Sequence, residues 1–261
     1  MGTVYLVGAG PGAVDLLTLR AVRLLERAEV VFFDALVGED ILAIASKAER
    51  IAVGKRCGAH STSQRFINKR LVDAAARHEV VVRLKGGDPM LFGRAHEELE
   101  ALAAAGVPCE VVPGVSAAFA AAAQHKVSLT QRGVARSVAF VTPRVGEGEE
   151  PHAWAQPAAR ADTTVVYMGA GEAGAIRDAL IALGRSGATP VALVENAERP
   201  GTRVQVGALA RLAELAARRG NGPALLLIGE VARGFVQAAG RDRSHDAEAS
   251  GLTRVPLRAV G

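Results

Sequence analysis

The sequence predicts an α/β protein with two lobes, a mainly parallel sheet in the first and a mixed sheet in the second. Short apolar runs alternate with helical patterns, which is typical of a sheet covered by helices on both faces. Two of the runs stop abruptly at glycine-rich segments, residues 8–12 and 86–89. Open α/β sheets bind ligands at the carboxyl ends of their strands. The two segments therefore predict a site for a small organic ligand in a cleft between the lobes.

The first half of the chain supplies the elements of the parallel sheet. We expect Asp15 to cap the first helix, because it stands just before a leucine-rich helical pattern. The predicted strands are residues 4–7, 30–33, 50–53, 80–84 and 110–112, and the predicted helices are residues 15–27, 64–77 and 95–105.

The second half predicts a mixed sheet, because residues 190–195 and 203–206 form an antiparallel hairpin pattern across a polar turn. The other predicted strands are 137–142, 163–168 and 224–228, with helices at 172–183 and 208–218. Pro113-Gly114 is the expected hinge. This divides the chain into a first lobe of residues 1–113, a second lobe of 114–240 and an aperiodic, flexible tail of 241–261. Residues 146–150 are expected to form a surface loop.

Composition narrows the class of protein. At 261 residues and 49% hydrophobic, the chain is long and apolar enough for a packed core. No apolar run reaches about 18 residues, and Met1 leads directly toward a strand, so we expect neither a membrane span nor a signal peptide. Cys57 and Cys109 are too few for a disulfide framework and lack metal-ligand spacing. A reducing cytoplasm is the expected location.

The net charge of +4 has two interpretations. Arginine supplies most of the 31 basic residues, and the arginines are scattered. They form either a solvated surface or an excess that attracts a polyanionic substrate. Aromatic residues make up only 4% of the chain and no basic stripe contains them, so nucleic acid is not an expected partner.

The first glycine segment fits more than one function. Gly8, Gly10 and Ala13 have the spacing of a dinucleotide-binding loop, and Asp34 ends the next strand as in such a unit. Pro11 argues against a pyrophosphate ligand, because it has no N–H to donate and the helix starts later. A nicotinamide site, a simple tight turn and a site for another cofactor remain the alternatives.

The second glycine segment is either a strand-ending turn or a ligand contact. Asp88 and Pro89 are residues that favour a turn. Gly86 and Gly87 equally allow the backbone to approach a bulky ligand, and the Asp88 carboxylate is able to accept hydrogen bonds from an amine or a ribose.

Several motifs together carry a family resemblance. GAGPG, VGKR, VVRLKGGDPMLFGR, VVPGVSAA, SLTQR and VVYMG follow one another in this order. The chain resembles the tetrapyrrole methyltransferases that use S-adenosylmethionine, over roughly residues 3–235, and the resemblance implies their fold. VGKR and GGDPMLFGR are longer and more specific than the shorter GDP motif of other members, and they point to the members that methylate uroporphyrinogen III.

The resemblance implies a binding site for S-adenosylmethionine, with S-adenosylhomocysteine as the product and no need for a metal. Met168 taken alone would more often be core filler, but it ends a strand directly before a glycine. The implied donor contacts are Pro11, Gly86, Gly87, Asp88, Leu91, Ser116, Ala117, Met168 and Ala197.

The resemblance also implies residues that hold the tetrapyrrole. Arg94 and Glu97 lie three apart at a helix start. They form either a surface ion pair or a substrate site, in which Arg94 receives a carboxylate and Glu97 orients it or a pyrrole N–H. Arg132 is expected to have a similar role. Asp34 and Lys55 match a proposed proton acceptor and proton donor, although a carboxylate at a strand end is ordinarily just solvated.

Two positions depart from the family pattern. Gln131 stands where the family usually has histidine, and Thr142-Pro143-Arg144 replaces Thr-Gly-His.

The activity implied is two successive C-methylations of uroporphyrinogen III, through precorrin-1 to precorrin-2, on a route to cobalamin or sirohaem. The family is dimeric, which implies a homodimer. The alternatives are a methyltransferase acting on a later corrin intermediate and a protein that binds a tetrapyrrole or the methyl donor without turnover.

Overall fold

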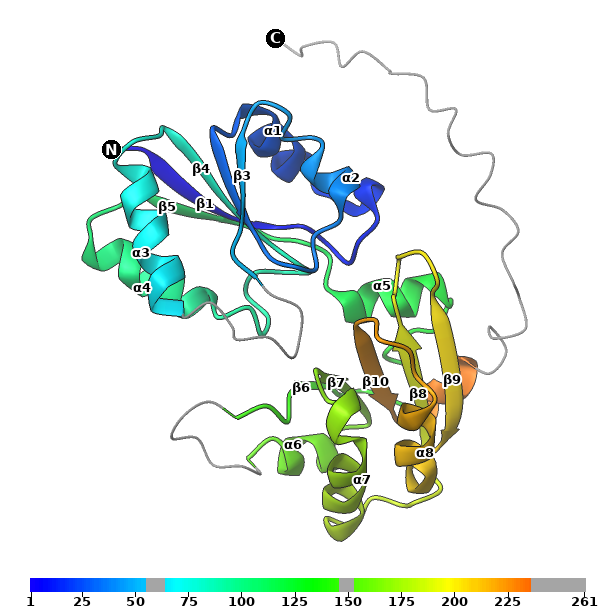
Figure 1. The fold of residues 1–261 in the computed structure, drawn as a ribbon. Coiled ribbons are helices and arrows are strands. Elements are labelled where there is room, and N and C mark those ends of the chain that lie inside the picture. The colour runs from blue at the N-terminus through cyan, green and yellow to red at the C-terminus, as the bar shows by residue number, and fades with distance from the viewer. Residues whose placement is uncertain (55–63, 146–152, 236–261) are drawn as a thin grey trace, which may run out of the picture.

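The computed structural model contains two five-stranded sheets, each in its own lobe (Figure 1). It describes residues 1–54, 64–145 and 153–235. Lys55, the predicted surface loop at 146–150 and the predicted tail at 241–261 lie outside these ranges. Among the helices of the described residues, none is long and apolar enough to cross a membrane.

The N-terminal sheet is wholly parallel, with the strand order β3-β2-β4-β1-β5. Its strands are β1 (Thr3–Gly8), β2 (Val30–Phe33), β3 (Glu49–Ala52), β4 (Val80–Lys85) and β5 (Cys109–Val112). Apolar residues of α1 (Leu19–Arg27) and α2 (Glu39–Leu42) pack on one face, and those of α3 (Gln64–Ala75) and α4 (Ala95–Ala104) pack on the other. The expected parallel sheet covered on both faces is confirmed.

The register of this sheet brings the ends of its strands together. Gly8 of β1 lies opposite Lys85 of β4, and Phe33 of β2 lies opposite Leu84. The loops that follow these strands, which begin at Ala9, Asp34 and Gly86, therefore leave the sheet at one edge. This is the carboxyl-terminal edge, where parallel sheets bind ligands.

The C-terminal sheet is mixed, in the order β6-β7-β10-β8-β9, and only the β6–β7 pair is parallel. The strands are β6 (Val138–Val141), β7 (Thr163–Tyr167), β8 (Pro190–Glu195), β9 (Arg203–Ala208) and β10 (Ala224–Ile228). On one face lie α6 (Ala155–Arg160), α7 (Ala173–Ala182) and α8 (Leu212–Ala217), and on the other lies α5 (Ala117–Gln124). The predicted hairpin of β8 and β9 is present.

The ten predicted strands are all present, but the first helix begins later than the sequence predicts. Val14–Leu16 form a short 3-10 turn (η1), and α1 starts at Leu19. The Thr18 hydroxyl accepts a hydrogen bond from Ala21 N at 3.1 Å, so Thr18 is the N-cap. The prediction for Asp15 was wrong because the backbone is extended at Leu17 and Thr18, which separates the turn from the helix.

The remaining differences concern short helices. The predicted helix at 208–218 is only α8, because β9 continues to Ala208 and a 3-10 turn, η3 (Leu209–Arg211), follows it. The sequence did not predict α2, α5 or α6. The signal for α5 was its composition, AAFAAAAQ, since alanine favours helix without any apolar periodicity.

Candidate functional site

The two glycine segments pair with each other through their backbones. Gly87 N donates to Gly10 O at 2.7 Å, and Gly10 N donates to Gly87 O at 3.2 Å. Both residues have φ of +69°, a conformation that glycine adopts without steric cost. The loops after β1 and β4, which are distant in sequence, therefore form one continuous surface.

A third loop, which follows β5, packs against them at backbone distance. A Cβ atom on Gly114 would lie 2.3 Å from Gly87 O, and one on Gly8 would lie 2.6 Å from Gly114 Cα. No side chain fits at either contact. Gly8 and Gly114 thus have a packing reason, and the three loops together present a bare backbone edge that a ligand can approach.

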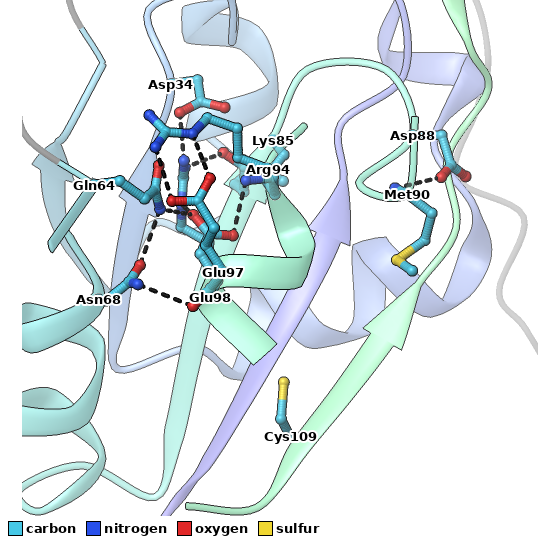
Figure 2. Close-up of polar contacts among 12 residues, drawn as sticks. Asp34, Gln64, Asn68, Lys85, Asp88, Met90, Arg94, Glu97, Glu98 and Cys109 are labelled. Carbon is cyan, nitrogen blue, oxygen red and sulfur yellow. Dashed lines mark hydrogen bonds and ion pairs between the residues drawn. The ribbon is translucent and has the colours of Figure 1, made fainter. Parts of the chain in front are cut away.

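Asp88 holds this arrangement in place. Its Oδ2 accepts a hydrogen bond from Gly114 N at 3.0 Å, and its Oδ1 accepts one from Met90 N at 2.8 Å; the Met90 contact is drawn in Figure 2. The predicted turn role of Asp88 is therefore present in the structure. A carboxylate has about four lone-pair sites, so these two bonds leave acceptor capacity for a ligand.

The C-terminal lobe brings a second group of predicted donor contacts. Ser116 is buried, and its Oγ lies 2.6 Å from the Tyr167 hydroxyl at the end of β7. Burial raises the pKa of Tyr167, and the hydrogen bonds with Ser116 and Ala118 N only partly offset this. The Phe92 ring, which follows the Gly86–Asp88 turn, lies 5.2 Å from the Tyr167 ring. Of these contacts, the one between Phe92 and Tyr167 joins the two lobes.

Met168 is not core filler. It follows Tyr167 directly, has φ of +56° and is 43% exposed. Ala197 is buried after β8, between two residues that also have positive φ, Asn196 and Glu198. Left-handed backbone at non-glycine residues is uncommon and tends to occur at functional sites. Of the other predicted contacts, Pro11 is buried, Leu91 is half-buried, and Ala117 is the first residue of α5.

Arg199 was not predicted, and it crosses between the lobes. Its Nε donates to Pro11 O at 2.7 Å, and its Nη2 donates to Leu36 O, two residues beyond Asp34. Burial lowers the pKa of Arg199. A groove with a volume of about 1840 Å³ lies between the lobes here, lined by Gly12–Asp15 and Asp40 on one side and by residues of 198–205 on the other. None of the predicted donor contacts lines this groove, but Gly12, the last residue of the first glycine segment, does.

Asp34 joins a group of buried charges on β4 and α4 (Figure 2). Arg83 Nη2 lies 2.6 Å from Asp34 Oδ1, and Arg83 Nε lies 2.9 Å from Glu98 Oε1. Lys85 Nζ lies 2.8 Å from Glu98 Oε2. The Glu98 side chain is 0% exposed and those of Arg83 and Lys85 are 3% exposed, whereas that of Asp34 is 30% exposed. We call these four residues the buried charge group.

The electrostatics of the group differ between its two cations. Burial would lower the pKa of Arg83, but the charges of Asp34 and Glu98 outweigh burial and raise it. The pKa of Lys85 is lowered, first by burial and then by the neighbouring charge of Arg83, which Glu98 only partly offsets. Arg83 is therefore the firmly charged partner of both carboxylates.

The sequence contains a signal for this group beyond its motifs. Strand β4 reads VVVRLK, so Arg83 and Lys85 sit two apart on one face of a central strand. Charged residues are almost never fully buried unless they are paired. Two of them on a strand that is covered on both faces indicated acidic partners on a covering helix.

The predicted substrate residues are arranged differently. Arg94 and Glu97 form a two-pronged ion pair on the surface, with Nε–Oε1 at 2.7 Å and Nη2–Oε2 at 2.8 Å. Arg132 is exposed in a turn closed by the bridge between Gln131 and Ala135. No hydrogen bond or ion pair joins Arg132 to the Arg94–Glu97 pair within the described ranges. Lys55 lies outside those ranges.

Comparison with known proteins places the chain in a family. The model of the tetrapyrrole (corrin/porphyrin) methylases matches residues 3–213. A uroporphyrin-III C-methyl transferase from Thermus thermophilus, solved in complex with S-adenyl homocysteine, is 44% identical with a TM-score of 0.79, over 89% of this chain and 99% of its own. A cobalt precorrin-4 methyltransferase is 28% identical with a TM-score of 0.77, over 88% of this chain and 95% of its own.

The chain therefore belongs to the tetrapyrrole methylase family, and the predicted fold and methyltransferase class are confirmed. Siroheme synthase 1 of Cronobacter sakazakii is 46% identical over 248 residues, which are 95% of this chain but 52% of that protein. The chain spans about half the length of the siroheme synthases it matches.

Proposed function

We propose that this chain transfers methyl groups from S-adenosylmethionine to carbon atoms of uroporphyrinogen III, twice, giving precorrin-2 through precorrin-1. The carrying observation is the backbone-paired Gly10–Gly87 loops at the carboxyl ends of β1 and β4. The 44% identity to a structure that holds S-adenyl homocysteine supports the choice of donor. The similarity to siroheme synthases favours sirohaem as one destination of the product, with cobalamin as another.

The donor site proposed here follows the three glycine loops. The backbone of Gly86 and Gly87 contacts the donor, and Asp88 fixes the turn and offers its remaining lone pairs to an amine or ribose hydroxyl. Pro11, Leu91, Ser116, Ala117, Met168 and Ala197 complete the pocket from both lobes. Pro11 lacks the N–H that a dinucleotide pyrophosphate would use, which disfavours the nicotinamide alternative.

The chemistry requires alignment and one proton transfer. A carbon of the electron-rich tetrapyrrole attacks the methyl group. The new C–C bond forms as the C–S bond breaks, and the electron pair of the C–S bond stays with sulfur. A proton then leaves the tetrapyrrole. We assign Asp34, which is half-exposed at a strand end, as the group that accepts this proton. Lys55 is assigned as a proton donor or as a fixed positive charge. Holding the two reactants in line supplies much of the rate.

The substrate carries several carboxylates, so its site must supply cations. We propose that Arg94, oriented by Glu97, and Arg132 receive them, because the planar guanidinium binds carboxylates in a two-pronged geometry. The exposed Arg94–Glu97 pair already displays this two-pronged geometry.

We further propose a homodimer in the cytoplasm. The edge strand β6 and helix α5 border an apolar hollow of about 490 Å³ whose lining includes Phe119, Val138 and Phe140. Phe119 is 54% exposed, and a second copy of the chain would cover it. Sedimentation velocity checks this: a monomer at micromolar concentration contradicts the dimer, and Phe119→Asp should dissociate it.

One experiment separates the proposed activity from its alternatives. The chain is incubated with uroporphyrinogen III and methyl-labelled S-adenosylmethionine, and the product mass is measured. Two labelled methyl groups are expected. An enzyme for a later corrin intermediate would leave uroporphyrinogen III unmodified but methylate a corrin, and a binding protein would modify neither. Calorimetry with S-adenosylhomocysteine and NADH tests the donor site, where binding of NADH alone would overturn the assignment.

A further inference from the structure

We propose that Arg83 is a positioning residue for Asp34, and that Glu98 and Lys85 hold Arg83 in place. This rests on the proposed function, in which Asp34 accepts the proton. The inference begins with the placement of Arg83: one guanidinium, almost fully buried, bridges a buried carboxylate on α4 and a half-exposed carboxylate at the end of β2.

The contacts of Arg83 fix its plane. Nη2 donates to Asp34 Oδ1, Nε donates to Glu98 Oε1, and Nη1 donates to Leu84 O at 3.2 Å. Because a guanidinium is planar and rigid, three acceptors around it leave one orientation. Asp34 Oδ1 is thereby tied to the sheet. Asp34 Oδ2 forms no hydrogen bond with the described residues, and the side chain is 30% exposed, so this is the oxygen left to take a proton.

Glu98 is itself held on both oxygens. Its Oε1 also accepts from Gln64 Nε2 at 3.2 Å, and its Oε2 accepts from Lys85. Gln64 Nε2 donates in turn to Asn68 Oδ1 at 2.9 Å, and Asn68 Nδ2 donates to Glu97 O at 2.9 Å (Figure 2). A chain of polar contacts thus runs from α3 and α4 through Arg83 to Asp34, and it leaves Glu98 no freedom to rotate.

The charges of the group balance one another: with Asp34 ionised, the two cations and two carboxylates sum to zero. Buried ion pairs add little net stability compared with apolar residues of similar volume. Their presence beside Asp34 is therefore better explained by orientation than by folding energy.

A double-mutant cycle tests the coupling of Arg83 to Asp34. Arg83→Met is expected to lower kcat roughly 10- to 100-fold, the cost of a misplaced reactive group. The KM for the tetrapyrrole and the Kd for S-adenosylhomocysteine should stay within about twofold of wild type. In the Asp34→Asn background, Arg83→Met should cause no further loss of kcat, because Arg83 acts only through the Asp34 carboxylate.

Controls keep the outcomes distinct. If Arg83→Met does not fold, Arg83→Lys takes its place in the cycle, since it keeps the charge and loses the planar fork. Arg50→Met is the matched control: Arg50 also bridges a carboxylate, Glu39 Oε1 at 3.0 Å, and a backbone carbonyl, but on the surface. It should leave kcat unchanged.

Equal loss of kcat in both backgrounds, or wild-type kcat for Arg83→Met and Arg83→Lys, would overturn the proposal. Failure of the proposed function looks different: the wild type would then not methylate uroporphyrinogen III, or Asp34→Asn alone would keep its kcat.

Discussion

Glu97 and Glu98 are neighbours on α4, yet their environments have nothing in common. Glu97 lies on the surface with Arg94, and the two side chains are 44% and 59% exposed. Glu98 is wholly buried between Arg83 and Lys85. The Arg94 bond lowers the pKa of Glu97. The difference shows that solvent exposure decides how much an ion pair contributes to stability. Water screens the attraction between Arg94 and Glu97, whereas the attraction between Glu98 and its two cations must offset the cost of removing all three charges from water.

The largest expected effect comes from removing the buried carboxylate. Glu98→Ala leaves Arg83 and Lys85 in the core with one partner fewer, and should lower the free energy of unfolding by about 3–5 kcal/mol. Glu97→Ala is the matched control and should change it by less than about 1 kcal/mol. Urea unfolding followed by circular dichroism measures both. Similar losses for the two variants would mean that burial does not separate these glutamates.

The adjacent glutamates also mark the limit of what the sequence could predict. The apolar patterns predicted all ten strands, the parallel first sheet and the mixed second sheet, because few other folds accommodate apolar runs that alternate with helices. The glycine loops were found for the same local reason. The buried charge group was not predicted, since two adjacent glutamates in the first turn of a helix do not show which of them points inward. That depends on how α4 packs over β4, which is set by tertiary contacts. Arg199 was missed similarly, as its acceptors lie more than 160 residues away.

The second prediction concerns the exposed Arg94–Glu97 pair, which should contribute to substrate binding and not to the stability of the fold. Arg94→Leu should weaken tetrapyrrole binding by roughly 1.5–3 kcal/mol, the value of a hydrogen bond to a charged group. The Kd for S-adenosylhomocysteine should be unchanged. The KM for the tetrapyrrole checks the first expectation, and calorimetry with S-adenosylhomocysteine checks the second. Arg132→Leu should behave in the same way.

Arg211 provides the matched control for Arg94. It pairs with Glu214 three residues later, at 2.8 Å, and both side chains are more than half exposed. Arg211→Leu should leave both the KM and the Kd unchanged. If Arg94→Leu behaves like Arg211→Leu, the Arg94–Glu97 pair is only a surface ion pair, and the carboxylates of the substrate must bind elsewhere.

The third prediction is a pH dependence from Lys85. Its pKa in the folded chain lies below the ordinary value of 10.5, first because of burial. The unfolded chain therefore binds the proton more tightly, and stability from this group rises with pH through the window just below 10.5. Lys85→Met should cost less near neutrality than Glu98→Ala, because an apolar replacement leaves no unpaired charge. Relative to Lys85→Met, the wild type should gain stability as pH rises through that window, whereas a constant difference would contradict the lowered pKa.

The smallest expected effect uses Cys109 on β5 as a sensor of the charge at Glu98. Burial raises the pKa of the Cys109 thiol to about 11; a backbone hydrogen bond from Leu6 lowers it, and the charges of Glu98 and Glu110 raise it. At pH 9 only about 1% of the thiol is then ionised, and alkylation is slow because the thiolate is the reactive form.

Glu98→Gln should lower the pKa of the Cys109 thiol and speed its alkylation in the Cys57→Ser background. Glu97→Gln should not. The pH dependence of the rate with iodoacetamide separates ionisation from access, since access alone scales the rate equally at every pH. Identical pH profiles for the two variants would mean that the charge at Glu98 does not reach β5.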